Sequence, residues 1–232
     1  SVNDAILQSN YDVTSGSAWS YSARTICQVV GSIGTSTRGR AITAYYFGDG
    51  PTAAIYTGAI HGNELSTRSL MLRWIDELEA NPGNIPAGKS VVVVPAINPD
   101  GVAAGQRTNA NNVDLNRNFA TSDWKKDITT VSNAPFPGGG GSAPMSEPEA
   151  RAIAGLVAQR RPRLVLSYHS VAAVVISNQS GDANARAATY VSLSGYGNAT
   201  GQSSTTFDYS ISGTADDYYA ESLGVPSLIV EL

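Results

Sequence analysis

The stretch TAAIYTGAIHGNE, residues 52–64, is a nearly uninterrupted apolar run that stops at a histidine, which is followed three residues later by a glutamate. Its first part, residues 52–60, predicts a strand that is buried on both faces. From Leu65 to Ala80 the apolar residues recur with a helical period, and one predicted helix face carries Leu65, Leu72, Trp74, Ile75 and Leu78. His61 is therefore expected at the carboxyl end of a strand and Glu64 at the start of a helix, where ligand sites collect in open α/β sheets.

The chain contains only two histidines, and the second follows another predicted strand. Residues 164–168 form a short apolar run that ends at His169, and residues 227–230 form a last one that ends at Glu231. Because neighbouring parallel strands end at the same edge of a sheet, we expect the side chains of His61, His169 and Glu231 to converge.

This set of side chains matches the requirements of a catalytic zinc site. Zn²⁺ accepts imidazole nitrogen and carboxylate oxygen, and a catalytic site keeps one position open beside three protein ligands. His61, Glu64 and His169 supply three ligands, and Glu231 supplies a base that takes a proton during attack on a carbonyl and returns it to the leaving amine. An H-x-x-E pair alone does not establish a metal site. A glutamate close to the end of a sequence, as Glu231 is here, is usually a solvated charge.

Strands and helices alternate through most of the chain, which predicts an α/β fold with a mixed, mainly parallel twisted sheet and helices on both faces. We expect one domain over residues 1–232, with residues 1–23 as an N-terminal lead-in. The other expected elements are strands at 26–30, 41–47, 89–97 and 171–176, a turn at 31–36, and helices from a capping box at 146–149 to about 159, at 183–193 and at 215–223.

Residues 101–145 show little regular pattern and are rich in Asn, Gly and Pro. A loop of this length inside a domain is usually functional. Its segment RTNANNVDLNRNF, residues 107–119, is either a solvated surface or an anion-binding wall. An arginine fork matches a carboxylate bidentately, so one arginine suits the terminal carboxylate of a substrate. A second arginine suits the oxyanion formed at the attacked carbonyl.

The composition gives no indication of a nucleic-acid or membrane partner. The formal net charge is -4, from 15 basic and 19 acidic residues, and no run approaches the roughly 18–20 apolar residues of a membrane span. The single cysteine, Cys27, is interpreted as a small buried residue. We expect a monomer, and the scarcity of lysine with many Ser, Thr and Asn residues favours an extracytoplasmic (secreted or periplasmic) location over a cytoplasmic one.

Six short motifs occur in an order that resembles the M14 zinc carboxypeptidases, the carboxypeptidase A-like metallopeptidases. They are Gly39-Arg40, HGNE at 61–64, NPDG at 98–101, DLNRN at 114–118, SYHS at 167–170 and VEL at 230–232. The resemblance runs from about Gly31 to the end of the chain. It implies the phosphorylase/hydrolase-like fold of that family, one zinc ion on His61, Glu64 and His169, and Glu231 as the general base.

The resemblance also implies roles for residues of the long loop. Arg107 is expected to polarise the scissile carbonyl, Asn116 and Arg117 to hold the C-terminal carboxylate of a peptide substrate, and Asp114 to orient the imidazole of His61. Tyr209, which lies 22 positions before Glu231, matches the mobile tyrosine that closes over substrate. The other candidates for this tyrosine are Tyr196, Tyr218 and Tyr219.

Fewer residues of the sequence indicate which C-terminal residue the substrate carries. Asp216 falls where M14 enzymes set side-chain preference, and a carboxylate there suits a distal ammonium. The alternative is that Asp216 only interacts with the dipole of its own helix. Within the family the chain is most similar to the small bacterial murein-peptide amidases, which cleave the γ-D-glutamyl bond to diaminopimelate. The alternatives are a general carboxypeptidase on ordinary peptides and a non-catalytic peptide-binding relative, which would lack a ligand or the base.

Overall fold

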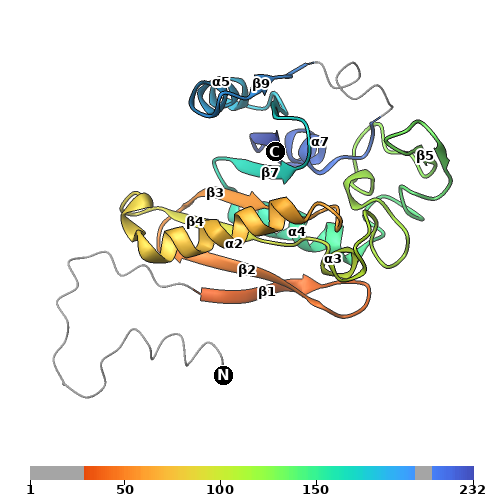
Figure 1. Ribbon diagram of the computed structural model, residues 1–232, viewed down its shortest axis with the longest axis horizontal. Helices are drawn as coiled ribbons and strands as arrows, with labels where there is room; N and C mark the ends of the chain where they lie inside the picture. The colour runs from red at the N-terminus through yellow and green to blue at the C-terminus, as the bar shows by residue number, and fades with distance from the viewer. Residues whose placement is uncertain (1–28, 202–210) are drawn as a thin grey trace.

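Eight strands form one mixed sheet in the computed structural model, which describes residues 29–201 and 211–232 (Figure 1). The order across the sheet is β1-β2-β4-β3-β7-β10-β8-β9. The strands are β1 (Val29–Thr35), β2 (Ala41–Gly48), β3 (Thr52–Thr57), β4 (Ser90–Val94), β7 (Val165–His169), β8 (Val174–Ser177), β9 (Gly197–Asn198) and β10 (Ser227–Glu231). The predicted fold class is confirmed. The predicted lead-in, Cys27 and Tyr209 lie outside the described residues.

The four central strands β4, β3, β7 and β10 run parallel to one another. Every residue of β4 and β7 is buried, as expected for strands covered on both faces. In the register between β10 and β7, Glu231 pairs with His169. The parallel strands therefore end at one edge of the sheet, and two of the predicted site residues are adjacent there.

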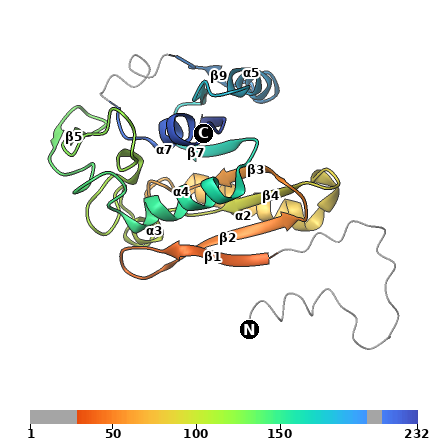
Figure 2. The ribbon, with the colours of Figure 1, turned by 180° about the vertical axis from the view of Figure 1, so that it is seen from behind.

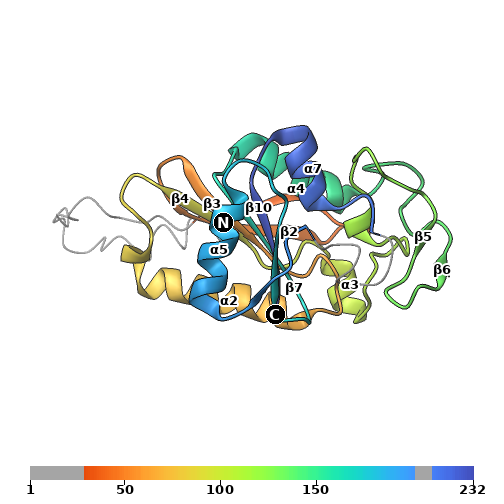
Figure 3. The same ribbon diagram turned by 90° about the horizontal axis from the view of Figure 1, so that it is seen from above.

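Helices cover both faces of the sheet, as Figure 3 shows. On one face, α2 (Leu65–Ala80) and α5 (Ala183–Ser194) contribute to a core cluster with Phe47 and Leu166. On the other face, α4 (Pro148–Arg160) and α7 (Ala215–Tyr218) with its π-helical continuation η3 (Tyr219–Leu223) pack against a second cluster. The expected helix at 215–223 is thus confirmed as α7 and η3.

The helix predicted from Leu65 to Ala80 has those bounds, and its buried face agrees with the predicted one at Ile75 and Leu78 but not at Leu65. The buried side chains are Thr67, Met71, Ile75 and Leu78. Leu65, which was expected on that face, is 49% exposed, because the buried row begins two residues later at Thr67. The Thr67 hydroxyl donates to the Glu64 carbonyl oxygen and accepts from the Ala59 N–H, both at 2.8 Å.

Several of the predicted strand and turn bounds are wrong, including the strand expected at 171–176, which begins only at Val174. The strand expected to run to residue 60 ends at Thr57, because the chain turns at Ala59, whose φ is 44°. The strand expected at 89–97 ends at Val94. The turn expected at 31–36 lies mostly inside β1, where a bulge between Ser32 and Gly34 keeps the pairing with β2.

The predicted capping box at 146–149 is also wrong. Helix α4 begins at Pro148 after Glu147, whose side chain makes no capping hydrogen bond. The Glu149 carboxylate is fully buried and accepts a hydrogen bond from the Thr37 N–H at 2.7 Å. Glu149 therefore ties the helix to the turn after β1 and does not cap its own helix.

The long loop contains α3 (Pro99–Ala104), η2 (Leu115–Arg117) and the short hairpin of β5 (Ile128–Thr129) and β6 (Pro135–Phe136). Another short 3-10 turn, η1 (Pro82–Asn84), follows α2. The loop extends beyond one end of the sheet (Figures 1 and 2). Asn118 in this loop is structural: it is fully buried, donates to the Gly140 carbonyl at 2.8 Å and accepts from the Glu147 N–H at 3.0 Å. Residues 113–119 are all buried, and only Asn111 and Asn112 of residues 107–119 are exposed, so most of this segment is not a solvated surface.

No helix in the described part of the chain combines the length and the apolar character that a membrane crossing requires.

Asp100 joins α3 to the hairpin of β1 and β2, and we expect Asp100→Asn to lower the free energy of unfolding by about 1–3 kcal/mol. Its carboxylate accepts from the Arg40 guanidinium at 2.6 Å and the Arg38 N–H at 2.9 Å. Burial opposes its ionisation, but these donors lower its pKa below the ordinary value. A carboxyl group whose pKa is lower in the folded state stabilises the fold at pH values above its pKa in the unfolded chain, about 3.9. The difference in unfolding free energy between wild type and variant therefore shrinks as the pH falls below about 3.9.

Urea unfolding at pH 7 and at acidic pH measures both effects. Asp76→Asn, at an exposed position of α2, is the control. A loss of stability no larger than that of the control would contradict the role of Asp100.

Candidate active site

His61 lies in a tight loop between β3 and α2, four residues beyond the end of its strand. The loop packs directly on α3: a Cβ atom at Gly62 would lie 2.1 Å from the Gly101 carbonyl carbon, so only glycine fits there. The Gly62 N–H donates to the Arg107 carbonyl oxygen at 3.2 Å, and the Asn98 amide donates to the same oxygen at 3.3 Å. These contacts bring the loop after β3 and the arginine segment together.

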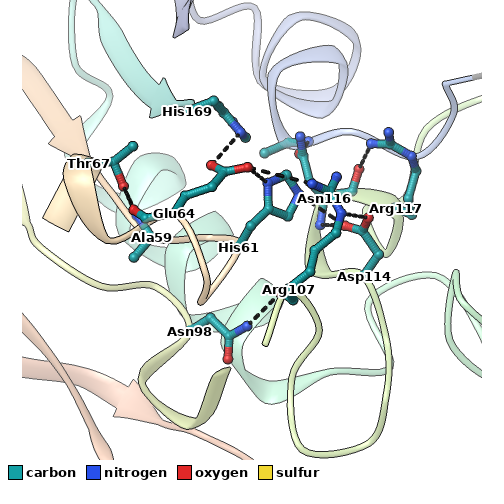
Figure 4. Close-up of polar contacts among 11 residues, drawn as sticks. Ala59, His61, Glu64, Thr67, Asn98, Arg107, Asp114, Asn116, Arg117 and His169 are labelled. Atoms are coloured by element: carbon teal, nitrogen blue, oxygen red, sulfur yellow. Dashed lines mark hydrogen bonds and ion pairs between the residues drawn. The ribbon is translucent and has the colours of Figure 1, made fainter. Parts of the chain in front are cut away.

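Three buried side chains meet at the carboxyl edge of the sheet (Figure 4). Ligand atoms of His61, Glu64 and His169 all lie within 4.8 Å of one another. Glu64 Oε1 is 2.7 Å from His61 Nδ1, and Glu64 Oε2 is 3.4 Å from His169 Nδ1. The convergence expected from the strand ends is confirmed.

Asp114 lies behind His61 and contacts its other ring nitrogen. Asp114 Oδ1 is 3.2 Å from His61 Nε2, and Asp114 Oδ2 accepts from Arg107 Nε at 2.9 Å. Burial alone would raise the pKa of Asp114, but the charges of His61 and Arg107 hold it well below the ordinary value. An ionised Asp114 therefore directs His61 Nδ1 towards Glu64, which is how a carboxylate partner orients a metal-binding histidine.

The donor set fits a zinc ion. Two imidazole nitrogens and one carboxylate are zinc ligands of the kind found in catalytic sites. Glu64 Oε2 is buried and, although His169 Nδ1 lies 3.4 Å away, makes no hydrogen bond in the described structure, so the centre contains an acceptor that a cation would satisfy. Burial opposes the ionisation of Glu64, but His61 and His169 lower its pKa below the ordinary value, which keeps it an anionic ligand.

Glu231 stands at the end of β10 and lines a cavity of about 470 Å³ together with the three candidate ligands. Burial raises the pKa of Glu231, although the nearby His169 imidazole opposes the rise. A carboxylate with a raised pKa is better suited to receive and return a proton near neutral pH.

Arg107, Asn116 and Arg117 line the same cavity. One guanidinium nitrogen of Arg107 is 3.5 Å from Glu64 Oε1, so Arg107 lies beside the candidate metal position. Arg117 is 3% exposed and donates to the Asn116 carbonyl at 2.7 Å. The Asn116 side-chain oxygen accepts from the Ala215 N–H at 2.9 Å, which ties this wall to α7.

Two other predicted site residues, Tyr209 and Asp216, have different outcomes. Tyr209 is not among the described residues, so its expected role stays a prediction. One of the competing tyrosines, Tyr219, is 1% exposed and packs in the core, its ring 6.3 Å from that of Phe119. Asp216 is 2% exposed, accepts from the Ser167 hydroxyl at 3.1 Å and lines a neighbouring cavity.

Sequence reasoning missed the apolar part of the cavity wall. Val131, from the turn between β5 and β6, and Val171, after β7, line the cavity and are 57% and 84% exposed. No local pattern marks Val131, because its position depends on how the long loop folds over the sheet edge. Val171 directly follows the SYHS motif, so its position two residues after His169 could have indicated that it lines the cavity.

Two histidines and a glutamate lie at the carboxyl edge of the sheet, and a further carboxylate lines the open cavity beside them. This is the arrangement expected of a catalytic zinc centre. Residues 21–232 match the family model described as zinc carboxypeptidase, Peptidase_M14. The chain belongs to this family, which confirms the resemblance expected from its motifs.

Two curated relatives illustrate the range of similar proteins. Murein peptide amidase A of Escherichia coli K12 is 33% identical over 146 residues, which cover 54% of this chain and 53% of that protein. Gamma-D-glutamyl-L-diamino acid endopeptidase 1 of Lysinibacillus sphaericus is 25% identical over 181 residues, covering 62% and 46%. The chain therefore spans about half the length of these relatives.

Solved structures confirm the fold. The murein-tripeptide amidase of Escherichia coli O157 superposes with a TM-score of 0.63 at 23% identity, covering 88% of this chain and 82% of that one.

Asp114→Asn is expected to weaken zinc binding by about 10- to 100-fold, because partners that orient a metal-binding histidine typically contribute that much. The asparagine side chain has nearly the same volume as aspartate but lacks the negative charge that faces His61. Competition with a chromophoric chelator measures the affinity, with Asp49→Asn, at an exposed position, as the control. An affinity equal to that of the control would show that Asp114 does not support the metal centre.

Proposed function

We propose that this protein is a zinc-dependent metallopeptidase that hydrolyses the amide bond to a C-terminal residue with a free carboxylate. The observation that carries the proposal is the joint placement of His61, Glu64, His169 and Glu231 around one cavity. Bound zinc supplies Lewis-acid polarisation and an acidified water at such a centre. A non-catalytic relative would lack a ligand or the base, and this chain retains all four residues.

The residues around the cavity divide the remaining tasks. Glu231 accepts the proton of the attacking water and returns it to the amine of the leaving residue. Arg107, beside Glu64, directs N–H donors at the oxyanion of the attacked carbonyl. Arg117 and Asn116 bind the substrate's C-terminal carboxylate, which places the preceding amide bond at the metal centre.

We further propose that the bond cleaved is the γ-D-glutamyl bond to a diamino acid in bacterial cell-wall peptides, and that the protein acts outside the cytoplasm as a monomer. The support for this substrate comes from the names of two relatives, a murein peptide amidase and a γ-D-glutamyl-L-diamino acid endopeptidase. A general carboxypeptidase is the second candidate, because Asp216 near the cavity suits basic C-terminal residues of ordinary peptides equally well.

A side-by-side assay of the zinc-loaded protein separates the two candidates. Peptides that end in the same diamino acid are compared after a γ-D-glutamyl group and after an ordinary α-linked residue. We expect the γ-D-glutamyl peptides to have the higher kcat/KM. Faster cleavage of the α-linked peptides would favour the general carboxypeptidase, and cleavage of neither would contradict the proposed reaction.

Asp216→Asn is expected to lower kcat/KM about 10- to 100-fold for a basic C-terminal residue, which corresponds to about 1.4–2.8 kcal/mol, and to change it little for phenylalanine. The reason is that the variant removes a buried negative charge opposite the expected ammonium while the volume stays the same. Steady-state kinetics on acylated dipeptides ending in lysine and phenylalanine measure the ratio. An equal loss on both would assign Asp216 a purely structural role.

A further inference from the structure

A groove of about 330 Å³ lies between α2, α3 and strand β2, and it shares no described lining residue with the catalytic cavity. The start of α2 and helix α3 lie side by side at this end of the sheet (Figures 1 and 3). Arg40, directly before β2, and Arg68, from α2, line the groove, and no acidic residue is among its described lining residues. We name this space the arginine groove.

Arg68, the fourth residue of α2, is half-buried and makes no hydrogen bond or ion pair with any described residue. On a helix, charges are usually compensated by residues three or four positions away. Three of those positions hold the apolar residues Leu65, Met71 and Leu72. The fourth holds Glu64, whose carboxylate is turned towards the histidines of the metal centre. The positive charge of Arg68 therefore has no partner on its own helix.

The guanidinium of Arg40 is only partly neutralised. It donates to Asp100 Oδ1 at 2.6 Å, while the Arg40 side chain stays 46% exposed. The other oxygen of this carboxylate, Asp100 Oδ2, accepts from the Arg38 N–H at 2.9 Å, so Asp100 is already engaged and does not pair with Arg68. In a chain whose formal net charge is -4, the groove thus carries a local excess of positive charge.

Apolar and hydroxyl-bearing side chains complete the wall of the arginine groove. Leu72, Pro95 and Val102 supply apolar surface, and Thr43 and Tyr45 supply hydroxyl groups. Neither hydroxyl has a hydrogen-bond partner among the described residues. Small-molecule sites typically combine apolar walls with a few polar groups, in volumes of about 300–1,000 Å³. The groove therefore matches a small ligand with an apolar face, hydrogen-bonding groups and a negative charge.

From these contacts and charges we infer that the arginine groove binds a small ligand that carries an oxyanion, a carboxylate or a phosphate, on a body about the size of one sugar ring. Arg68 binds the oxyanion, because a guanidinium matches both kinds of oxyanion through paired N–H donors. Arg40 adds positive charge, and the body of the ligand packs on the apolar wall. The inference does not depend on the proposed peptidase reaction, since the groove is separate from the catalytic cavity.

The test titrates three probes into the ¹⁵N-labelled, zinc-loaded protein and follows the amide chemical shifts by NMR. The probes are glucose-6-phosphate, glucuronate and uncharged glucose. We expect saturable shifts at groove residues such as Thr43 and Val102 with at least one anionic probe and none with glucose, and the tighter anionic probe identifies the oxyanion. No shift at the groove with either anionic probe, or shifts confined to catalytic-cavity residues such as Ser170 and Thr214, would overturn the inference.

Arg68→Gln is expected to raise the Kd of the tighter probe at least about 10-fold, the usual effect of losing a hydrogen bond to a charged group. Arg73→Gln, at an exposed position of α2 outside the groove, is the matched control and keeps the wild-type Kd. Equal Kd values for the two variants, with amide spectra that show the native fold, would contradict the role of Arg68.

A measurement on the wild-type protein provides a check that needs no variant. Because the proposed contact joins opposite charges at a partly exposed site, the Kd of the tighter probe is expected to rise as the salt concentration rises. A Kd that does not change with salt would contradict a site based on charge.

Discussion

Replacing Glu231 with glutamine is expected to lower kcat by about 10²- to 10⁴-fold, the range that general acid–base groups contribute, while zinc binding stays at one ion per chain. Glu231 lines the cavity but is not one of the three clustered ligand residues, so the metal centre does not need it. Glutamine has the same shape and cannot accept a proton from water at neutral pH. The fold is expected to be unaffected.

The measurement combines steady-state kinetics with metal analysis of the same preparation. Glu79→Gln, at an exposed position near the end of α2 and outside the residues that line the cavity, serves as a control for removal of a carboxylate. Wild-type turnover by Glu231→Gln would refute the proposed mechanism. Loss of zinc from that variant would instead place Glu231 among the ligands.

His169→Ala is expected to weaken zinc binding by more than about 100-fold, beyond the effect of a supporting residue such as Asp114, and to abolish activity. His169 contributes the only candidate ligand from β7, and its Nδ1 atom lies 3.4 Å from Glu64 Oε2. Burial would lower the pKa of His169, but Glu64 raises it, so removing the imidazole also deprives Glu64 of a buried partner.

Zinc titration by isothermal calorimetry measures this loss, and circular dichroism checks that the variant is folded. The comparison with Glu231→Gln separates metal binding from proton transfer. We expect His169→Ala to lose the metal, and Glu231→Gln to keep the metal and lose turnover. A folded His169→Ala protein that binds zinc as tightly as wild type would contradict the assignment of His169 as a ligand.

Those parts of the fold that depend on local periodicity were predictable from the sequence. The apolar period over Leu65–Ala80 predicted the bounds of α2, and the apolar runs before His169 and Glu231 predicted β7 and β10. The convergence of His61 and His169 followed from the parallel arrangement of these strands. The metal cluster was predictable because its ligands follow strand ends.

Features that depend on tertiary packing were not predictable. Residues 58–60 are as apolar as the strand before them, yet the positive φ of Ala59 takes them out of the sheet. Glu149 fits a capping pattern by sequence, but a contact with Thr37, far along the chain, determines its orientation. The cavity beside the candidate active site is likewise lined by residues from distant segments, such as Asp123 and Glu221, so no local motif indicates it.

The most direct test of the central claim compares one peptide in two forms, with a free C-terminal carboxylate and with a C-terminal amide, incubated with the zinc-loaded protein and analysed by mass spectrometry. The proposed site predicts release of a single C-terminal residue from the free acid and cleavage at least about 100-fold slower for the amide, because Arg117 and Asn116 then have no carboxylate to bind. Equal cleavage of both forms, or cleavage at internal bonds only, would contradict the proposal that this is a carboxypeptidase-type active site.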